Sequence, residues 1–176
     1  LGYVAAKDQA LNDRLRVFAV TMGLSASPFD CWLAERGLLT FELRFERAQC
    51  TAAILADHLA GLPGVKRVLY PGRADHPQAD ICAKQMKGGS TLVAIELKGG
   101  KEAAFSMQNK LEVVKLSNNL GDTKSLITHP ATTTHKNLAE EARAELGIGL
   151  GVLRLSVGIE DVEDLIEDFD HALSGL

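Results

Sequence analysis

The sequence is poor in cysteine, in aromatic residues and in long apolar runs, and these shortages exclude whole classes of protein. Its three cysteines, Cys31, Cys50 and Cys82, lie far apart and are odd in number. This spacing argues against the disulfide framework of a small secreted domain and indicates reduced thiols in the cytoplasm. No apolar run approaches the ~20 residues that cross a bilayer, so no membrane partner is expected.

Basic residues are too few and too scattered to form a surface for nucleic acid. The 19 lysines and arginines are interspersed among 23 acidic residues, and the formal net charge is -4. Nucleic acids and anionic membranes are therefore not expected as partners, whereas a small anionic ligand is compatible with this balance. The 176 residues, 46% of them hydrophobic, suffice for a core and fit one domain, or one domain plus a piece of another.

The first residues are expected to lie in the middle of a larger fold. Residues 2–7, Gly-Tyr-Val-Ala-Ala-Lys, are typical of a short buried strand that enters a helix, and the chain begins at Leu1 without an initiator methionine. We therefore expect the chain to be a fragment.

Three helices are predicted in the first 60 residues. Asp8 is a suitable cap for a helix that runs to about Met22, and Ser27 followed by Pro28 begins a shorter helix. From residue 40 to about residue 60, the apolar residues keep a helical period over roughly five turns. A helix of that length is suited to connecting two domains.

Beyond residue 64, strands alternate with helices. Strands are predicted over 65–70, 91–97, 113–116 and 152–157, and helices over 78–86, 101–110, 138–146 and the last residues of the chain. None of these strands is the long Val/Ile/Leu run that is typical of strands buried on both faces. The pattern predicts an α/β fold of the α+β type, with a small, mostly antiparallel four-stranded sheet and helices packed on one face.

The strand over 152–157, Val-Leu-Arg-Leu-Ser-Val, carries a candidate binding residue. Alternation places Leu153, Leu155 and Val157 on one face and Arg154 on the other, while the amphipathic helix that follows would support the strand from behind. On such a rigid platform, the planar guanidinium is suited to gripping a carboxylate or phosphate bidentately. On spacing alone, an arginine that faces solvent or pairs with a neighbouring acid is the commoner case.

The polar stretch from Ser117 to His135 has no periodic pattern, and its length indicates a mobile or functional loop. A phosphate-binding loop at 121–125 is rejected, because the first glycine of that motif is absent and no glycine directly precedes the lysine. His129 and His135 have no cysteine or acid at metal-ligand spacing, so a zinc site is not expected. The threonines at 132–134 would by default satisfy backbone groups in a turn.

Several motifs, taken together, resemble one enzyme family. They are Ser-Asn-Asn-Leu-Gly-Asp-Thr-Lys-Ser-Leu-Ile-Thr-His-Pro-Ala-Thr-Thr-Thr-His (117–135), Leu-Arg-Leu-Ser-Val-Gly-Ile-Glu-Asp (153–161), and the shorter Ser-Pro-Phe-Asp (27–30), Arg-Gly-Leu (36–38), Tyr-Pro-Gly (70–72), His-Pro-Gln (76–78) and Lys-Gln-Met (84–86). In this order, over nearly the whole chain, they resemble the C-terminal part of the Cys/Met-metabolism family of pyridoxal-phosphate enzymes. That family includes cystathionine γ-synthase, cystathionine β- and γ-lyases, methionine γ-lyase and the homoserine-ester sulfhydrylases.

The resemblance implies a domain organisation. The chain would be the C-terminal small domain of a fold-type I pyridoxal-phosphate enzyme together with the tail of the large domain. Residues 1–39 would be the tail of the large cofactor-binding domain, 40–62 the connecting helix and 63–176 the substrate-binding domain. Because members are tetramers, a homo-oligomer is expected, a tetramer at full length.

The resemblance also assigns roles to residues. In the family, the arginine at the position of Arg154 binds the α-carboxylate of the amino-acid substrate. Asn119 stands where many relatives have a serine beside that carboxylate, Leu120 would offer backbone contacts, and Thr134 would brace the arginine. Lys124 stands where lyases and synthases often carry glutamate; it would either favour an anionic succinyl leaving group or, by default, be a solvated loop lysine.

Asn119 and the Leu-Gly-Asp-Thr-Lys form look most like the O-succinyl- or O-acetylhomoserine sulfhydrylase branch. The full-length enzyme would then perform γ-replacement on such an ester with a sulfur nucleophile, in methionine biosynthesis. The family binds pyridoxal phosphate through a lysine in a Ser-x-Thr-Lys setting, which is absent here, so the catalytic and cofactor-binding residues are expected before Leu1 and the chain alone is expected to be inactive. A cystathionine γ-lyase or methionine γ-lyase, and a non-catalytic assembly domain, are the alternatives.

Overall fold

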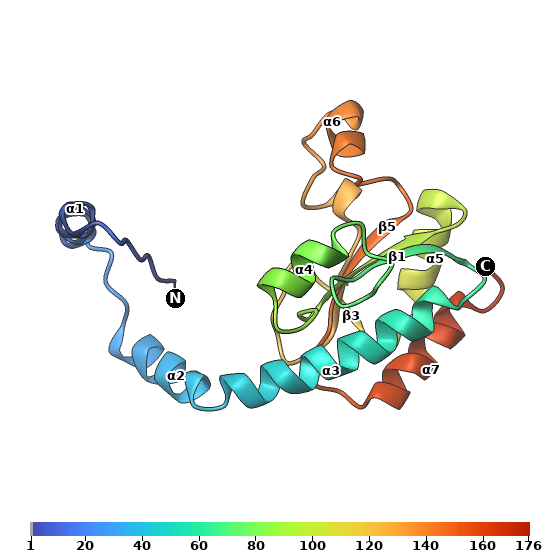
Figure 1. The fold of residues 1–176 in the computed structure, drawn as a ribbon, viewed down its shortest axis with the longest axis horizontal. Helices are drawn as coiled ribbons and strands as arrows, with labels where there is room; N and C mark the ends of the chain where they lie inside the picture. The colour runs from blue at the N-terminus through green and yellow to red at the C-terminus, as the bar shows by residue number, and fades with distance from the viewer. Residues whose placement is uncertain (1) are drawn as a thin grey trace. The chain divides into compact units, whose positions relative to one another are not determined.

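The computed structural model describes residues 2–176, which form two compact units that divide between Glu42 and Leu43. Figure 1 shows the elements of both units, and the boundary between them falls inside the long helix α3 (Phe41–Ala60). Among the helices of the described residues, none has the length and hydrophobicity that a bilayer crossing requires.

The first unit contains two predicted helices with their predicted caps. Helix α1 (Gln9–Thr21) begins where the Asp8 carboxylate accepts the N–H of Leu11 at 2.7 Å. Helix α2 (Pro28–Leu38) begins where the Ser27 hydroxyl accepts the N–H of Asp30 at 3.1 Å. These side chains satisfy donors that the first helical turn leaves unpaired.

The buried strand predicted over residues 2–7 is not formed. Tyr3 is 93% exposed and Val4 is 78% exposed, and no strand of the described residues pairs with this segment. A strand is stabilised by its ladder partners and its buried face, and here the segment has neither.

The second unit is built on a five-stranded sheet, one strand more than predicted. In spatial order the strands are β1 (Val65–Leu69), β2 (Leu92–Leu97), β5 (Val152–Ser156), β4 (Leu126–Thr128) and β3 (Lys115–Leu116). All neighbours are antiparallel except β3 and β4, which are parallel. The unpredicted strand is β4, which lies within the polar stretch together with a 3₁₀ turn at Pro130–Thr132. All three β4 residues are buried, so no alternation of polar and apolar residues marked it as a strand.

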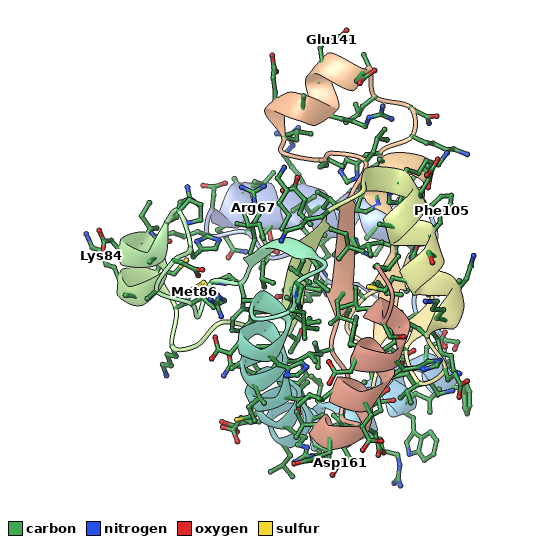
Figure 2. All side chains as sticks on the ribbon, turned by 90° about the vertical axis from the view of Figure 1, so that its right-hand side faces the viewer. Arg67, Lys84, Met86, Phe105, Glu141 and Asp161 are labelled. Atoms are coloured by element: carbon green, nitrogen blue, oxygen red, sulfur yellow. The ribbon has the colours of Figure 1, made fainter. Side chains whose placement is uncertain are left out.

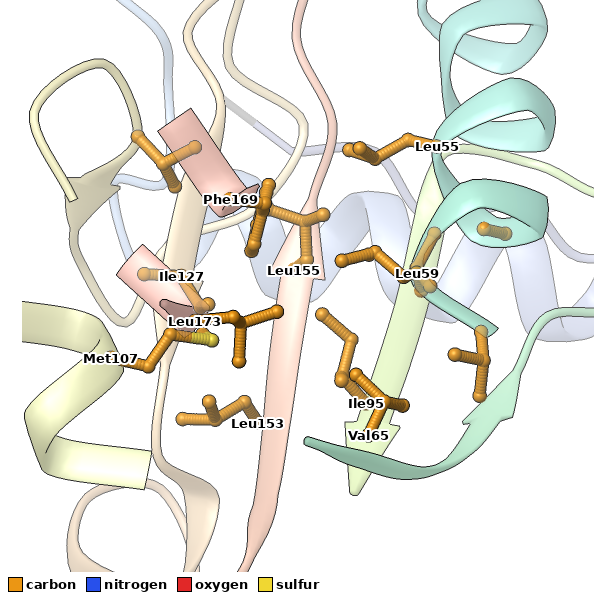
Figure 3. Packing of buried hydrophobic residues seen from close by; sticks show 14 of the residues in the cluster. Leu55, Leu59, Val65, Ile95, Met107, Ile127, Leu153, Leu155, Phe169 and Leu173 are labelled. Atoms are coloured by element: carbon orange, nitrogen blue, oxygen red, sulfur yellow. The ribbon is translucent and has the colours of Figure 1, made fainter. Parts of the chain in front are cut away.

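Helices cover one face of this sheet, as predicted. Besides α3, the second unit contains α4 (Ala79–Gln85), α5 (Gly100–Lys110), α6 (Glu140–Glu145) and α7 (Val162–Leu173). Figure 3 shows side chains of α3, α5 and α7 packed against the central strands; they include Leu55, Leu59, Met107, Phe169 and Leu173, against Ile95, Ile127, Leu153 and Leu155. Leu153, Leu155 and Val157 belong to the hydrophobic core that the helices cover, whereas Val152 and Arg154 do not, in agreement with the predicted alternation along β5.

A buried carboxylate fixes helix α7 to the turn before β3. The Asp168 oxygens accept the N–H groups of Glu112 at 2.7 Å, Val113 at 3.1 Å and Val114 at 3.0 Å. Three backbone donors thus share one charged acceptor on the helix that supports β5.

Candidate functional site

Arg154 lies near the middle of the sheet, on the face opposite the helices. It pairs in register with Ala94 of β2 and Thr128 of β4, and strands on both sides hold its backbone. The side chain is half-buried. The sequence-based expectation of a rigid platform under this guanidinium agrees with this placement.

The guanidinium uses one nitrogen to contact the polar loop. Nη2 donates to the carbonyl oxygen of Asn118 at 2.8 Å and to that of Asn119 at 3.2 Å. Nε is buried and has no hydrogen-bond partner, and it is the only buried side-chain nitrogen or oxygen of the described residues in that condition. An unsatisfied buried donor costs about 1–3 kcal/mol, so such an atom calls for an acceptor.

The charge of Arg154 is also unpaired. Within residues 2–176, no carboxylate lies within ion-pair distance of this guanidinium, although other arginines such as Arg73 do have acidic partners. The hydrogen-bond partners of the guanidinium are the backbone carbonyls of Asn118 and Asn119. A half-buried cation with one orientation-fixing nitrogen and no acidic partner among the described residues is suited to binding an incoming carboxylate.

The loop over residues 117–125 brings one of the predicted residues, Asn119, to Arg154. Asn119 contacts it through the backbone carbonyl, whereas the N–H of Asn119 donates to the Ser117 hydroxyl at 3.1 Å. Leu120 follows directly and is 54% exposed. The N–H of Gly121 then donates to the Ser156 hydroxyl of β5 at 2.9 Å, which ties the loop to the strand that carries Arg154.

Thr134, the other residue of the predicted site, does not hydrogen-bond to Arg154. Its hydroxyl pairs with Nδ1 of His135 at 2.8 Å. The threonine that faces the arginine across the sheet is Thr128, whose hydroxyl donates to Oδ1 of Asn118 at 2.8 Å. The default expectation that these threonines serve local turns therefore fits Thr134 better than direct bracing does.

Sequence reasoning missed Asn118 and Thr128 as parts of the site. The Thr128 and Thr133 hydroxyl oxygens lie 2.9 Å apart, and the Thr133 hydroxyl oxygen lies 2.8 Å from the carbonyl oxygen of His129, so the Thr133 hydrogen serves one of these two contacts. This chain of hydrogen bonds sets the position of Asn118, whose carbonyl holds Arg154. Thr128 could be found only after β4 was recognised, because its relation to Arg154 depends on strand pairing.

His129 has a structural place. Its Nε2 donates to the carbonyl of Leu150 at 2.8 Å, its Nδ1 pairs with the Thr132 hydroxyl at 2.9 Å, and its ring meets Phe105 edge-on. Figure 2 shows Phe105 on α5. No group of three or more His, Cys, Asp or Glu side chains suited to a metal ion occurs in the described residues.

A hollow of about 400 Å³ lies beside the loop, on the side of α5. Its lining is uncharged and consists of Phe105, Gln108, Asn109, Leu116, Ser117, Asn118, Ile127, Thr128, His129, Thr132 and Thr133. Further along the loop, the N–H of Lys124 and the hydroxyl of Thr123 donate to Asp122 and lower the pKa of that carboxyl group. Asp122 therefore stabilises the turn in its ionised form and lies on the exposed side of the loop.

Comparison with known proteins assigns this architecture. Residues 1–174 match the family model described as Cys/Met metabolism PLP-dependent enzyme. An O-succinylhomoserine sulfhydrylase of Mycobacterium tuberculosis is 45% identical over 156 residues, which are 86% of this chain and 38% of that protein. A cystathionine γ-lyase of Dictyostelium discoideum is 40% identical over 98% of this chain and 45% of the relative.

Solved structures agree. The crystal structure of cystathionine γ-synthase from Xanthomonas oryzae pv. oryzae, in complex with aminoacrylate and cysteine, superposes with a TM-score of 0.90 and 41% identity, over 97% of this chain and 44% of that one. The chain thus spans about two-fifths of the length of the curated relatives, from 38% to 45%. With a family model matched over 174 residues, the chain belongs to the Cys/Met-metabolism family of pyridoxal-phosphate-dependent enzymes.

Proposed function

We propose that the chain is the substrate-binding C-terminal part of a pyridoxal-phosphate-dependent transsulfuration enzyme. The full-length protein would perform γ-replacement on O-succinylhomoserine or O-acetylhomoserine with a sulfur nucleophile, in methionine biosynthesis. The observation that carries this proposal is the Arg154 guanidinium, with Nη2 held by two loop carbonyls and Nε buried without an acceptor. The α-carboxylate of an amino acid supplies the missing acceptor.

The described residues do not themselves form a site for pyridoxal phosphate. The family uses this cofactor, but every lysine of residues 2–176 is exposed or half-exposed, and none stands in a Ser-x-Thr-Lys setting. A lysine that forms a Schiff base at neutral pH needs a desolvated or otherwise perturbed amine. We therefore propose that the cofactor and its lysine belong to the part of the full-length protein before Leu1 and that this chain alone is inactive.

The other residues of the proposed site surround the carboxylate position. Asn119 and Leu120 would line it through the backbone of the loop, because the Asn119 carbonyl already touches Arg154. The resemblance assigns Thr134 to bracing Arg154, and its hydroxyl pairs with Nδ1 of His135 at 2.8 Å. Lys124 is exposed on the same loop, where it either meets an anionic acyl group or remains solvated.

The proposed organisation of the chain follows the family. Residues 1–39 would be the tail of the cofactor-binding domain, 40–62 the connecting helix and 63–176 the substrate-binding domain, in a full-length homotetramer of the cytoplasm. A non-catalytic assembly domain is the second candidate. It is favoured by the apolar side chains exposed on α2, such as Phe29 at 64% and Trp32 at 55%.

The synthase and lyase outcomes differ in product. The 45% identity to a sulfhydrylase and the 40% identity to a γ-lyase lie too close together to decide between them. The full-length protein, loaded with pyridoxal phosphate, is supplied with each homoserine ester and with sulfide or cysteine, and in separate reactions with cystathionine or methionine alone. Homocysteine or cystathionine as the product supports γ-replacement, whereas release of an α-keto acid from cystathionine or methionine supports a lyase.

The residue assignment has its own control. Arg154→Ala should raise the KM for the amino-acid substrate by about 30-fold or more, the loss expected for a bidentate charge-assisted contact. Arg67→Ala removes an arginine of β1 that pairs with Glu96 at 3.1 Å and should leave KM unchanged. Equal KM values for the two variants would refute the role of Arg154.

A further inference from the structure

The face of β5 that carries Arg154, together with the segment after the strand, contacts the loop over 118–125 at its beginning, middle and end. Arg154 and Ser156 lie on β5, and Gly158 and Glu160 follow it, the latter in a bend at residues 159–160. Arg154 holds the beginning of the loop and Ser156 holds its middle. The contacts of Gly158 and Glu160 with its end have no part in the site described above.

Glu160 binds the end of the loop through Ser125. One carboxylate oxygen accepts the N–H of Ser125 at 2.6 Å and the other accepts its hydroxyl at 2.9 Å. The same hydroxyl accepts the N–H of Gly158 at 2.9 Å. Ser125 is fully buried, and charge-assisted hydrogen bonds of this kind are about twice as strong as neutral ones.

The backbones of the two segments lie against each other at this point. The N–H of Ile159 donates to the carbonyl of Thr123 at 3.0 Å. A side chain at residue 158 would collide with the Thr123 carbonyl and the Glu160 carboxylate, so glycine is required for this approach. The loop end is therefore fitted closely to the segment that follows β5.

Glu160 itself is attached to a rigid element. The next residue, Asp161, caps helix α7 by accepting the N–H of Glu163 at 3.0 Å, and Figure 2 shows Asp161 at this end of the helix. Residues 118–124, by contrast, are exposed and form neither helix nor strand. Their geometry depends on these anchors to β5 and its extension.

We infer that Glu160 is a positioning residue for the substrate carboxylate. Through Ser125 it fixes the loop whose Asn118 and Asn119 carbonyls orient the Arg154 guanidinium. Without this anchor, the loop carbonyls sample more positions and the guanidinium loses its fixed orientation. The inference rests on the proposed role of Arg154, and its test separates the two.

The test measures how much the α-carboxylate contributes to binding. The full-length protein with bound pyridoxal phosphate is titrated with L-norleucine, which has no γ-leaving group, and with pentylamine, which is the same molecule without the carboxylate. Binding is followed by the absorbance of the cofactor. The ratio of the two affinities reports on the carboxylate contact, and a general loss of structure lowers both affinities without selecting the carboxylate.

Glu160→Ala should lower this ratio by about tenfold, the effect expected when charge-assisted hydrogen bonds that hold a binding group are removed. Ser125→Ala should lower it in the same direction. Glu160→Gln keeps the size and one acceptor and should give a smaller loss, which provides a readout if the alanine variant fails to fold. Glu167→Ala, an exposed glutamate of α7, is the matched control and should leave the ratio unchanged.

The outcomes distinguish the two proposals. If Arg154→Ala leaves the ratio unchanged, the carboxylate role of Arg154 fails. If Arg154→Ala abolishes the preference for norleucine while the Glu160 and Ser125 variants keep it, only the positioning role is overturned. The positioning role is also overturned if the Glu160 variants lower the affinities for norleucine and pentylamine equally, because the effect is then general destabilisation.

Discussion

Replacing Arg154 by methionine separates a binding arginine from a structural one. Methionine has a similar length and no polar hydrogen, so Arg154→Met removes the charge and the unsatisfied Nε donor together. The variant loses the bonds from Nη2 to the Asn118 and Asn119 carbonyls, but both residues are exposed and water can replace the guanidinium.

The opposing contributions are of similar size. A hydrogen bond to a charged group contributes about 1.5–3 kcal/mol, and an unsatisfied buried donor costs about 1–3 kcal/mol. We therefore expect Arg154→Met to change the free energy of unfolding by no more than about 1 kcal/mol, although it abolishes carboxylate binding. Substrate binding would then depend on this residue, whereas the stability of the fold would not.

The assay is urea denaturation of the chain followed by far-UV circular dichroism. Leu155→Ala, on the next residue and the opposite face of β5, is the reference, because it truncates a fully buried side chain and should cost about 2–5 kcal/mol. The slopes of the two transitions should agree, so that midpoints report stability. If Arg154→Met destabilises the chain as much as Leu155→Ala does, the arginine is part of the structural framework and the reasoning is refuted.

Three further predictions concern the framework around the site. Asp168→Ala leaves three backbone donors unpaired and should cost about 3 kcal/mol or more of unfolding free energy, Asp168→Asn should cost less, and exposed Glu167→Ala should stay near zero in the same urea assay. Gly158→Ala forces its new side chain against the Thr123 carbonyl and should cost about 1–3 kcal/mol, with a lower thermal midpoint as the readout; an unchanged midpoint would contradict the close approach. Burial, with smaller contributions from Cys50 and Asp57, raises the pKa of Tyr70 from 10.0 to about 12. Its neutral form therefore supports the fold fully below pH 10, and this support is lost as pH rises through 12. The unfolding free energy should fall less steeply over this range in Tyr70→Phe than in the unaltered chain, and equal slopes would exclude the effect.

The fold was predictable where the sequence pattern is long or strongly periodic. The caps at Asp8 and Ser27 have side chains that accept backbone donors locally, so they needed no tertiary information. Strand β4 was not predictable, because its three residues are all buried and lie inside a polar stretch. They show neither the two-residue alternation of a half-buried strand nor the period of a helix. The strand predicted over residues 2–7 was wrong although its sequence pattern was clear. The apolar pattern favours a strand, but no strand of the described residues pairs with this segment.

The candidate site also contains residues that the sequence pattern could place and residues that it could not. Alternation along β5 was sufficient to place Arg154 on the face away from the helices. Its partners are backbone carbonyls, and any residue type has a carbonyl, so no sequence pattern could point to Asn118. The role of Asn119 was predicted from its side chain, but in this structure it is the backbone of Asn119 that reaches the guanidinium.

One strand therefore does two different tasks with its two faces. Leu153 and Leu155 on one face pack against the helices, and this packing fixes the position and direction of β5 within the sheet. The opposite face and its extension carry Arg154, Ser156 and Glu160, which contact one irregular loop at its beginning, middle and end. Because the loop has no regular structure of its own, its shape is set by a strand that cannot shift without opening the core. The strand and the loop together thus fix the Arg154 guanidinium, whose Nε has no hydrogen-bond partner among the described residues, and this fixed cation is what our proposal assigns to the substrate carboxylate.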